Sequence, residues 1–170
     1  MFGSRRIVVA VSRTHLAIAE VHGIHSVSTL YDGSWNASTL GVIFEKLEKA
    51  IGAQHIRLLL DDDIAYVYSE TIPFGVENQR AWLLPRVQER IPEQLTNENW
   101  DFREVKKTKT GNEVVVFAPN EAVWNMVLEA ANAHGMTIDA SEPMSIARKR
   151  HANPIIGLCL LYTSPSPRDQ

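Results

Sequence analysis

The chain has 170 residues, of which 45% are hydrophobic and 22% are charged. This composition is typical of a globular protein and argues against an intrinsically disordered chain. The formal net charge of −3 argues against a dedicated nucleic-acid-binding protein, which is normally basic. The single cysteine, Cys159, excludes an internal disulfide and a cysteine-based zinc site.

Three short strands are predicted at the start of the chain. Residues 6–12, 16–21 and 24–31 carry the β-branched and apolar side chains that are typical of strands. Gly23 and Asp32-Gly33 indicate turns next to the second and third strands. Because short turns join successive antiparallel strands, we expect a three-stranded antiparallel meander.

A helix and a buried strand are predicted next. Apolar residues recur every three or four positions across 40–51, which places them on one face of a helix. Asn36 or Ser38 can cap the start of this helix, and Gly52 can cap its end. The continuous apolar run at 56–60 indicates a buried strand. Strand, helix and strand in this order predict a parallel crossover connection.

The later elements form a mixture of strands and helices. Pro85 lies inside a helical segment, where proline costs about 3 kcal/mol, so we expect a kink or two short helices there. The expected elements are a strand at 64–72, a helix at 76–91, strands at 100–105 and 113–118, a helix at 121–134, a strand at 136–140, a helix from 141 to 150 and a strand at 154–161.

The end of the chain differs from the rest in composition. Residues 162–170 are polar and include two prolines. The string Leu-Tyr-Thr-Ser-Pro-Ser-Pro-Arg-Asp that starts at Leu161 is similar to translated adapter or vector sequence. We therefore treat residues 161–170 as a non-native tail and exclude them from the expected fold.

Two segments are candidates for binding an anion or a metal. Ser12, Arg13 and Thr14 follow the first strand, and a tight turn with hydroxyl and N–H groups can bind phosphate. A plain hairpin turn is the alternative interpretation. The acidic run at 61–63 ends the strand at 56–60, and carboxylates at such a position can hold Mg²⁺. Adjacent strand residues point to opposite faces, so a solvated turn is the preferred interpretation.

A basic tip is predicted between the strands at 100–105 and 113–118. Lys106, Lys107 and Lys109 lie in the polar connection between them. Such a tip suits nucleic acid or an anionic membrane surface, and a solvated loop is the simpler alternative. The sequence contains no nucleophile motif and no histidine pair at the i,i+4 zinc spacing, so no catalytic residue and no metal ligand are predicted.

Several short segments from Thr71 onward carry a pattern of their own. They are Thr71-Ile72-Pro73, Ile91-Pro92, Trp100-Asp101-Phe102, the run from Val114 to Val123, Ala133-His134-Gly135-Met136, Ile138-Asp139, Glu142-Pro143 and Ala147-Arg148. In this order and spacing they resemble the PilM family, the cytoplasmic component of type IV pilus machinery. The similarity covers about residues 6–150.

The resemblance implies an α/β, ribonuclease-H-like (actin-like ATPase) fold, of which this chain would be the truncated amino-terminal half. Residues 1–62 would form the actin-like subdomain with the meander, helix and strand. Residues 63–139 would form a small inserted α+β subdomain. Residues 140–160 would form the return helix and the start of the second half.

One departure from the family affects the expected activity. Ala10-Val11-Ser12 stands where the family usually has Asp-x-Gly in its first phosphate loop. The carboxylate that positions a metal and the permissive glycine are both missing, so Ser12, Arg13 and Thr14 would form a degenerate phosphate loop. We therefore expect no catalysis and no cofactor for this chain. ATP is the cofactor that the fold would imply for the full-length protein.

The resemblance implies a scaffold at the inner face of the inner membrane. Such a protein would bind the short cytoplasmic tail of an inner-membrane pilus protein and couple to the pilus assembly ATPase, without binding nucleic acid. The alternatives are the cytoplasmic domain of a type II secretion scaffold and an actin-like ATP-binding protein of the FtsA or kinase type.

Overall fold

The structure, a computed structural model, describes residues 6–22, 26–96 and 98–150, with the side chains of 148–150 left out. The predicted strand at 154–161, the tail at 161–170 and the first two residues of the predicted strand at 24–31 lie outside the described residues. The chain divides into two compact units. The first unit comprises Met1–Ile64 and Ala122–Gln170, and the second comprises Ala65–Glu121.

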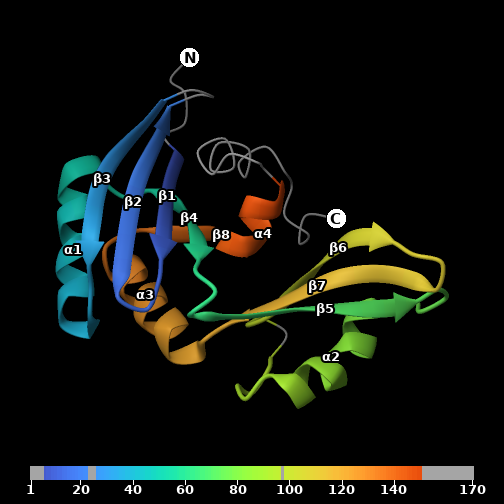
Figure 1. The fold of residues 1–170 in the computed structure, drawn as a ribbon. Helices are drawn as coiled ribbons and strands as arrows, with labels where there is room; N and C mark the ends of the chain where they lie inside the picture. Colours follow the sequence, from blue (N-terminus) through green and yellow to red (C-terminus); the bar gives the residue numbers. More distant parts are fainter. Residues whose placement is uncertain (1–5, 23–25, 97, 151–170) are drawn as a thin grey trace. The chain divides into compact units, whose positions relative to one another are not determined.

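The first unit contains a five-stranded sheet in the order β3-β2-β1-β4-β8 (Figure 1). Its strands are β1 (Arg6–Val11), β2 (His15–His22), β3 (Ser26–Ser34), β4 (His55–Leu60) and β8 (Thr137–Pro143). β1, β2 and β3 pair antiparallel, which confirms the predicted meander. β1, β4 and β8 pair in parallel, which confirms the predicted crossover.

Helix α1 (Ala37–Ile51) joins β3 to β4 and is capped by residues that the sequence indicates. The Asn36 side chain accepts hydrogen bonds from the backbone N–H groups of Ser38 and Thr39. Gly52 ends the helix at φ +75°, in the left-handed region that favours glycine. The apolar stripe of the helix is buried and consists of Leu40, Ile43, Phe44 and Leu47.

The strand register assigns apolar residues to the two faces of this sheet. One face is made by alternate residues of β1 and β4, which are at most 3% exposed: Ile7, Val9, Val11, Ile56, Leu58 and Leu60. Helices α1 and α3 (Glu121–Ala133) lie on this side of the sheet (Figure 1). The opposite face carries a smaller cluster, in which Val8, Val21 and Leu59 pack with Ala147 of α4 (Met144–Arg150).

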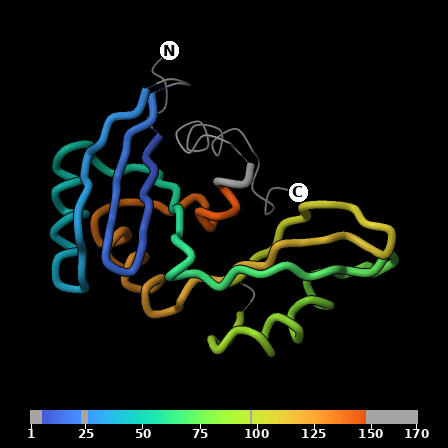
Figure 2. Tube along the Cα trace, in the orientation of Figure 1, coloured from blue at the N-terminus to red at the C-terminus, as the bar shows by residue number. Residues whose placement is uncertain are grey.

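The second unit is a three-stranded antiparallel sheet with one helix. The strand order is β5-β7-β6, with β5 (Ala65–Pro73), β6 (Asp101–Lys107) and β7 (Gly111–Pro119). Helix α2 (Gln79–Arg90) covers one face of the sheet. The chain passes from β4 into this unit and leaves it from β7 into α3 (Figure 2). The core consists of Ile72, Leu83, Val87, Ile91, Trp100, Val114, Val116 and Ala118.

Of the two expectations for Pro85, a kink or two short helices, the second is wrong, because α2 is one helix with Pro85 inside it. Leu83 and Val87 lie on either side of the proline and are both 0% exposed. Pro85 itself is exposed, so the side of the helix that it interrupts faces away from the core. Burial of the neighbouring apolar residues therefore holds the helix together across the missing N–H group.

The structure also divides the chain differently from the predicted insertion at 63–139. The second unit ends at Glu121, and α3 and β8 belong to the first unit. The reason is strand pairing: β8 pairs in parallel with β4 over six residues, from Thr137 to Pro143. Periodicity reveals that this segment is extended, but it does not reveal which sheet the segment joins.

Candidate functional site

The predicted phosphate loop at Ser12, Arg13 and Thr14 forms the turn between β1 and β2. The backbone N–H of Ser12 donates to the carbonyl oxygen of His15 at 2.9 Å. In return, the backbone N–H of His15 donates to the Ser12 hydroxyl oxygen at 3.0 Å. The turn is therefore closed by hydrogen bonds between its own first and last residues.

Trp35 fixes this turn from the end of β3. Its indole Nε1 donates to the carbonyl oxygen of Ser12 at 2.9 Å. Its backbone N–H donates to the carbonyl oxygen of Thr14 at 3.0 Å. The Trp35 side chain is buried, so both turn carbonyls are held against the body of the first unit. His15 contacts the Asp32 carboxylate at 2.5 Å on the exposed side.

Asp63 supplies a carboxylate to the same turn. β1 and β4 are parallel neighbours, so the residues that follow them lie at the same edge of the sheet. The backbone N–H of Arg13 donates to the two carboxylate oxygens of Asp63, at 3.2 and 3.1 Å. The Arg13 guanidinium donates to the backbone carbonyl of Asp63 at 2.9 Å. The hydrogen bonds between Arg13 and Asp63 therefore involve the backbone and the side chain of both residues.

These contacts do not fit a nucleotide phosphate. A phosphate loop binds its ligand through backbone N–H groups that point at the anion. Here the N–H groups of Ser12, Arg13 and His15 all have acceptors within the chain. A phosphate placed at Arg13 would also lie next to the negative charge of Asp63 and be repelled by it.

The acidic run at 61–63 does not converge on one point. The Asp61 carboxylate accepts from the backbone N–H of Asp62 at 2.7 Å, and the Asp61 carbonyl accepts from Ile64 at 3.1 Å. Only the Asp63 carboxylate turns toward β1. Arg13 and Asp63 both lie in segments that the sequence indicates as candidates, but their contact is not evident from the sequence. Both residues follow parallel strands, and this shared position is the feature of the sequence that could have predicted their contact.

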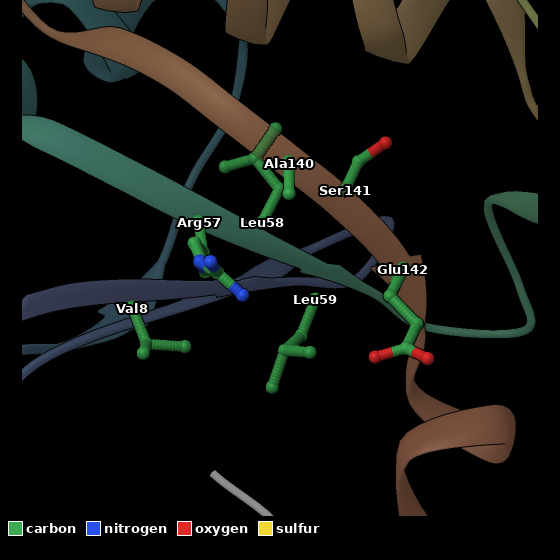
Figure 3. Close-up of a pocket in the computed structure, with 7 residues that line it drawn as sticks. All are labelled: Val8, Arg57, Leu58, Leu59, Ala140, Ser141 and Glu142. Atoms are coloured by element: carbon green, nitrogen blue, oxygen red, sulfur yellow. The ribbon is translucent and has the colours of Figure 1, made fainter. Parts of the chain in front are cut away.

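A second candidate site is a small groove on the face of the first unit where α4 packs (Figure 3). Its cavity volume is only about 30 Å³. Val8 and Leu59 point to the side on which α4 lies, as Figure 3 shows. The residues that line the groove come from β1, β4 and β8: Val8, Arg57, Leu58, Leu59, Ala140, Ser141 and Glu142.

The groove combines an apolar floor with charged groups at its rim. Val8 and Leu59, whose side chains form this floor, are at most 5% exposed. Leu58 borders the groove but points to the other face of the sheet. Arg57 and Glu142 are half-buried and place a cation and an anion beside this floor. Pockets for cofactors and drug-sized ligands commonly exceed about 300 Å³. The groove is therefore far too small for a whole nucleotide, and the most that it could accept is a single side chain laid on its apolar floor.

No metal site is evident in the part of the chain that the structure describes. Within residues 6–22, 26–96 and 98–150 there is no group of three or more His, Cys, Asp and Glu side chains that could hold a metal ion. Over the same residues, no helix is long and apolar enough to cross a membrane.

No family model and no curated sequence matches the chain. Solved structures do match it. The cytoplasmic domain of EpsL, an inner-membrane component of the type II secretion system of Vibrio cholerae, has a TM-score of 0.56 at 18% identity over 85% of this chain and 59% of that chain. The PilM–PilN type IV pilus biogenesis complex has a TM-score of 0.57 at 19% identity, over 84% and 48% of the two chains.

A third solved structure identifies the fold class. It is a protein of unknown function from Bacteroides thetaiotaomicron with an actin-like ATPase fold, and it has a TM-score of 0.50 at 11% identity. The match covers 85% of this chain and 53% of that chain. The chain thus spans about half the length of the structures that it matches. The predicted likeness is confirmed at the level of the fold: the chain has an α/β, actin-like ATPase fold similar to that of PilM and of the EpsL cytoplasmic domain.

Proposed function

We propose that this chain belongs to a scaffold of type IV pilus assembly and that it has no catalytic activity of its own. The scaffold binds the short cytoplasmic tail of an inner-membrane pilus protein and is held by it at the inner face of the inner membrane. It also couples to the pilus assembly ATPase. Its fold is similar to that of PilM in the PilM–PilN complex and to that of the EpsL cytoplasmic domain, which supports this role.

The observation that carries the proposal is the contact of Asp63 with the turn at Arg13. The Asp63 carboxylate takes the position in which an anion would accept the N–H of Arg13. An ATP-binding protein of this fold needs that position open for phosphate. A scaffold has no such need, and a turn that is closed by its own chain keeps its shape without a ligand. The occupied turn therefore favours the scaffold over an actin-like ATP-binding protein.

The groove beside α4 is the place where we propose that a partner side chain binds. Extended peptides are commonly held by backbone hydrogen bonds and by apolar pockets that accept alternate side chains. β8 is the edge strand of the described sheet, and its residues Ala140, Ser141 and Glu142 line the groove. A peptide that runs along this edge could place an apolar side chain over Val8 and Leu59.

Binding of labelled tail peptides tests the proposal. The peptides are the cytoplasmic tails of inner-membrane proteins encoded next to this protein, and fluorescence anisotropy with the full chain measures their affinity. We expect one tail to bind and Ala140→Trp, which fills the groove, to weaken it by about tenfold or more. Ala50→Trp on the exposed surface of α1 is the matched control and should not change the affinity.

Three results would contradict parts of this proposal. Failure of every tail to bind would exclude tail capture. Equal binding to wild type and to Ala140→Trp would move the site away from the groove. Binding of a fluorescent ATP analogue by the wild-type chain would favour the ATP-binding alternative. If the tail that binds belongs to a secretion protein rather than to a pilus protein, the type II secretion alternative is the correct one.

A further inference from the structure

The tip of the second unit combines exposed apolar side chains with lysines. The residues are Phe74, Val105, Lys106, Lys107 and Lys109, and we call them the basic tip. Phe74 follows β5, whereas the other four belong to β6 and to the turn between β6 and β7. The lysines stand out in the sequence, but Phe74 is separated from them by about 30 positions and joins them only in the fold.

Strand pairing brings the two segments to the same end of the sheet. Pro73, the last residue of β5, pairs with Gly111, the first residue of β7. The residues beyond this pair are Phe74 on one side and the turn at 108–110 on the other. Lys107 pairs with Asn112, one position from the turn. Figure 1 shows the arrowhead of β5 at the same end of the sheet as the turn between β6 and β7.

The two apolar residues of the basic tip are unusually exposed. Phe74 is 60% exposed and Val105 is 59% exposed, the highest values among the large hydrophobic residues that the structure describes. The register of β6 against β7 shifts between Glu104 and Lys106, so Val105 is an extra residue in a β-bulge. Neither residue belongs to the core of the second unit. Both are therefore available to a partner.

The lysines of the basic tip are available as well. All three are exposed, and none forms an ion pair with any residue in the described part of the chain. The segment from Lys106 to Gly111 contains no acidic residue. Glu113 pairs across the strands with Lys106, so its charge offsets that lysine most directly. Lys107 and Lys109 remain the main source of positive potential.

We propose that the basic tip binds the surface of an anionic lipid bilayer. Lysines near an anionic leaflet are attracted to its negative potential, and an aromatic side chain beside them can enter the headgroup region. Phe74 supplies the apolar anchor, and Lys107 and Lys109 supply the attraction. The chain would then contact the membrane directly. This inference goes beyond the proposed capture of a partner tail and does not depend on it.

The observations favour lipid over other anionic partners. A nucleic-acid site needs a longer track of basic residues, and the chain as a whole carries a net charge of −3. An acidic protein partner would use the lysines but would leave an isolated aromatic side chain such as Phe74 without a pocket. A bilayer surface accepts both groups without a shaped partner surface.

Sedimentation with lipid vesicles tests this inference on the full chain. The vesicles contain either phosphatidylcholine alone or phosphatidylcholine with 30% phosphatidylglycerol. We expect binding to the anionic vesicles only. Each lysine near a surface contributes about fivefold to partitioning, so the loss of two positive charges in Lys107→Glu with Lys109→Glu should weaken binding at least on the order of 20-fold, and the two added negative charges should weaken it further. Phe74→Ser should weaken it about fivefold and leave the net charge unchanged.

A second pair of lysines provides the matched control. Lys46 and Lys49 are exposed on α1, and replacing both by glutamate changes the net charge by the same amount. The inference requires this double variant to bind like the wild type. It is wrong if the control pair loses as much binding as the tip pair, if Phe74→Ser binds unchanged, or if the wild type does not sediment with anionic vesicles. The wild type would fail to sediment with anionic vesicles if the tip binds an acidic protein or a nucleic acid instead.

Discussion

Replacing Asp63 by alanine tests how far the turn at Arg13 depends on this carboxylate. The substitution removes the acceptor of the Arg13 N–H at 3.1 and 3.2 Å but leaves the Asp63 carbonyl that accepts the guanidinium. Hydrogen bonds to charged groups contribute about 1.5–3 kcal/mol, and exposure to water reduces this value. We therefore expect a loss of about 1 kcal/mol in the free energy of unfolding.

Thermal and urea unfolding of the full chain measure this loss. About 1 kcal/mol corresponds to a fall in Tm of roughly 2–4 °C for a protein of this size. Intrinsic fluorescence follows the unfolding, because both units contain tryptophans and Trp35 donates to Ser12 in this turn. Asp63→Asn removes the negative charge but keeps a side-chain oxygen that can accept the N–H of Arg13. It should retain about half of the stability that Asp63→Ala loses.

Asp62→Ala is the control for the Asp63 substitution. Asp62 is exposed, and its carboxylate has no hydrogen-bond or ion-pair partner among the described residues. Its removal should change the free energy of unfolding by less than about 0.5 kcal/mol. Two results would refute the reasoning: stability of Asp63→Ala within about 0.3 kcal/mol of the wild type, or an equal loss in Asp62→Ala. Either would mean that the Asp63 contact does not hold the turn.

Four further substitutions concern the strands, the helices and a buried hydroxyl, and urea unfolding checks each of them. Gly111→Ala should destabilise by about 1–3 kcal/mol, because its Cβ would lie 2.1 Å from the carbonyl oxygen of Ile72. Gly41→Ala in α1, where a Cβ meets nothing within 4 Å, should instead stabilise by about 0.5–1 kcal/mol. Pro85→Ala should stabilise by about 2 kcal/mol, since it restores an N–H inside α2. Tyr68→Phe should stabilise by about 1 kcal/mol, because the buried hydroxyl has no partner among the described residues. Burial raises the pKa of Tyr68, so the wild type alone should lose stability as the pH rises above about 10, where the unfolded tyrosine ionises first.

Local chemistry explains why much of the fold was predictable. The caps of α1 are set by neighbouring residues: Asn36 is hydrogen-bonded to Thr39, three positions away, and Gly52 takes the positive φ that glycine favours. The continuous apolar run in β1 follows from the burial of both faces of the sheet at this strand. Such features depend on a few adjacent residues, so the sequence alone reveals them.

Features that join distant segments were not predictable in the same way. The contact of Arg13 with Asp63 spans 50 positions and exists because β1 and β4 are neighbours in the sheet. Membership of β8 in the first unit depends on its pairing with β4, not on its composition. Phe74 joins the lysines of the basic tip through the pairing of Pro73 with Gly111. In each case the missing information was which strands lie side by side.

The closed turn also has a consequence for stability in the presence of nucleotide. A ligand that binds only the folded state stabilises it by about 2.7 kcal/mol at a concentration 100 times its Kd. If the N–H groups of Ser12 and Arg13 keep their acceptors within the chain, ATP gains no hydrogen bond there. We therefore expect 1 mM ATP with Mg²⁺ to leave the Tm of the full chain unchanged within about 0.5 °C. A rise of several degrees would show that ATP binds the folded chain, and loss of that rise in Arg13→Ala would identify the turn as a working phosphate loop.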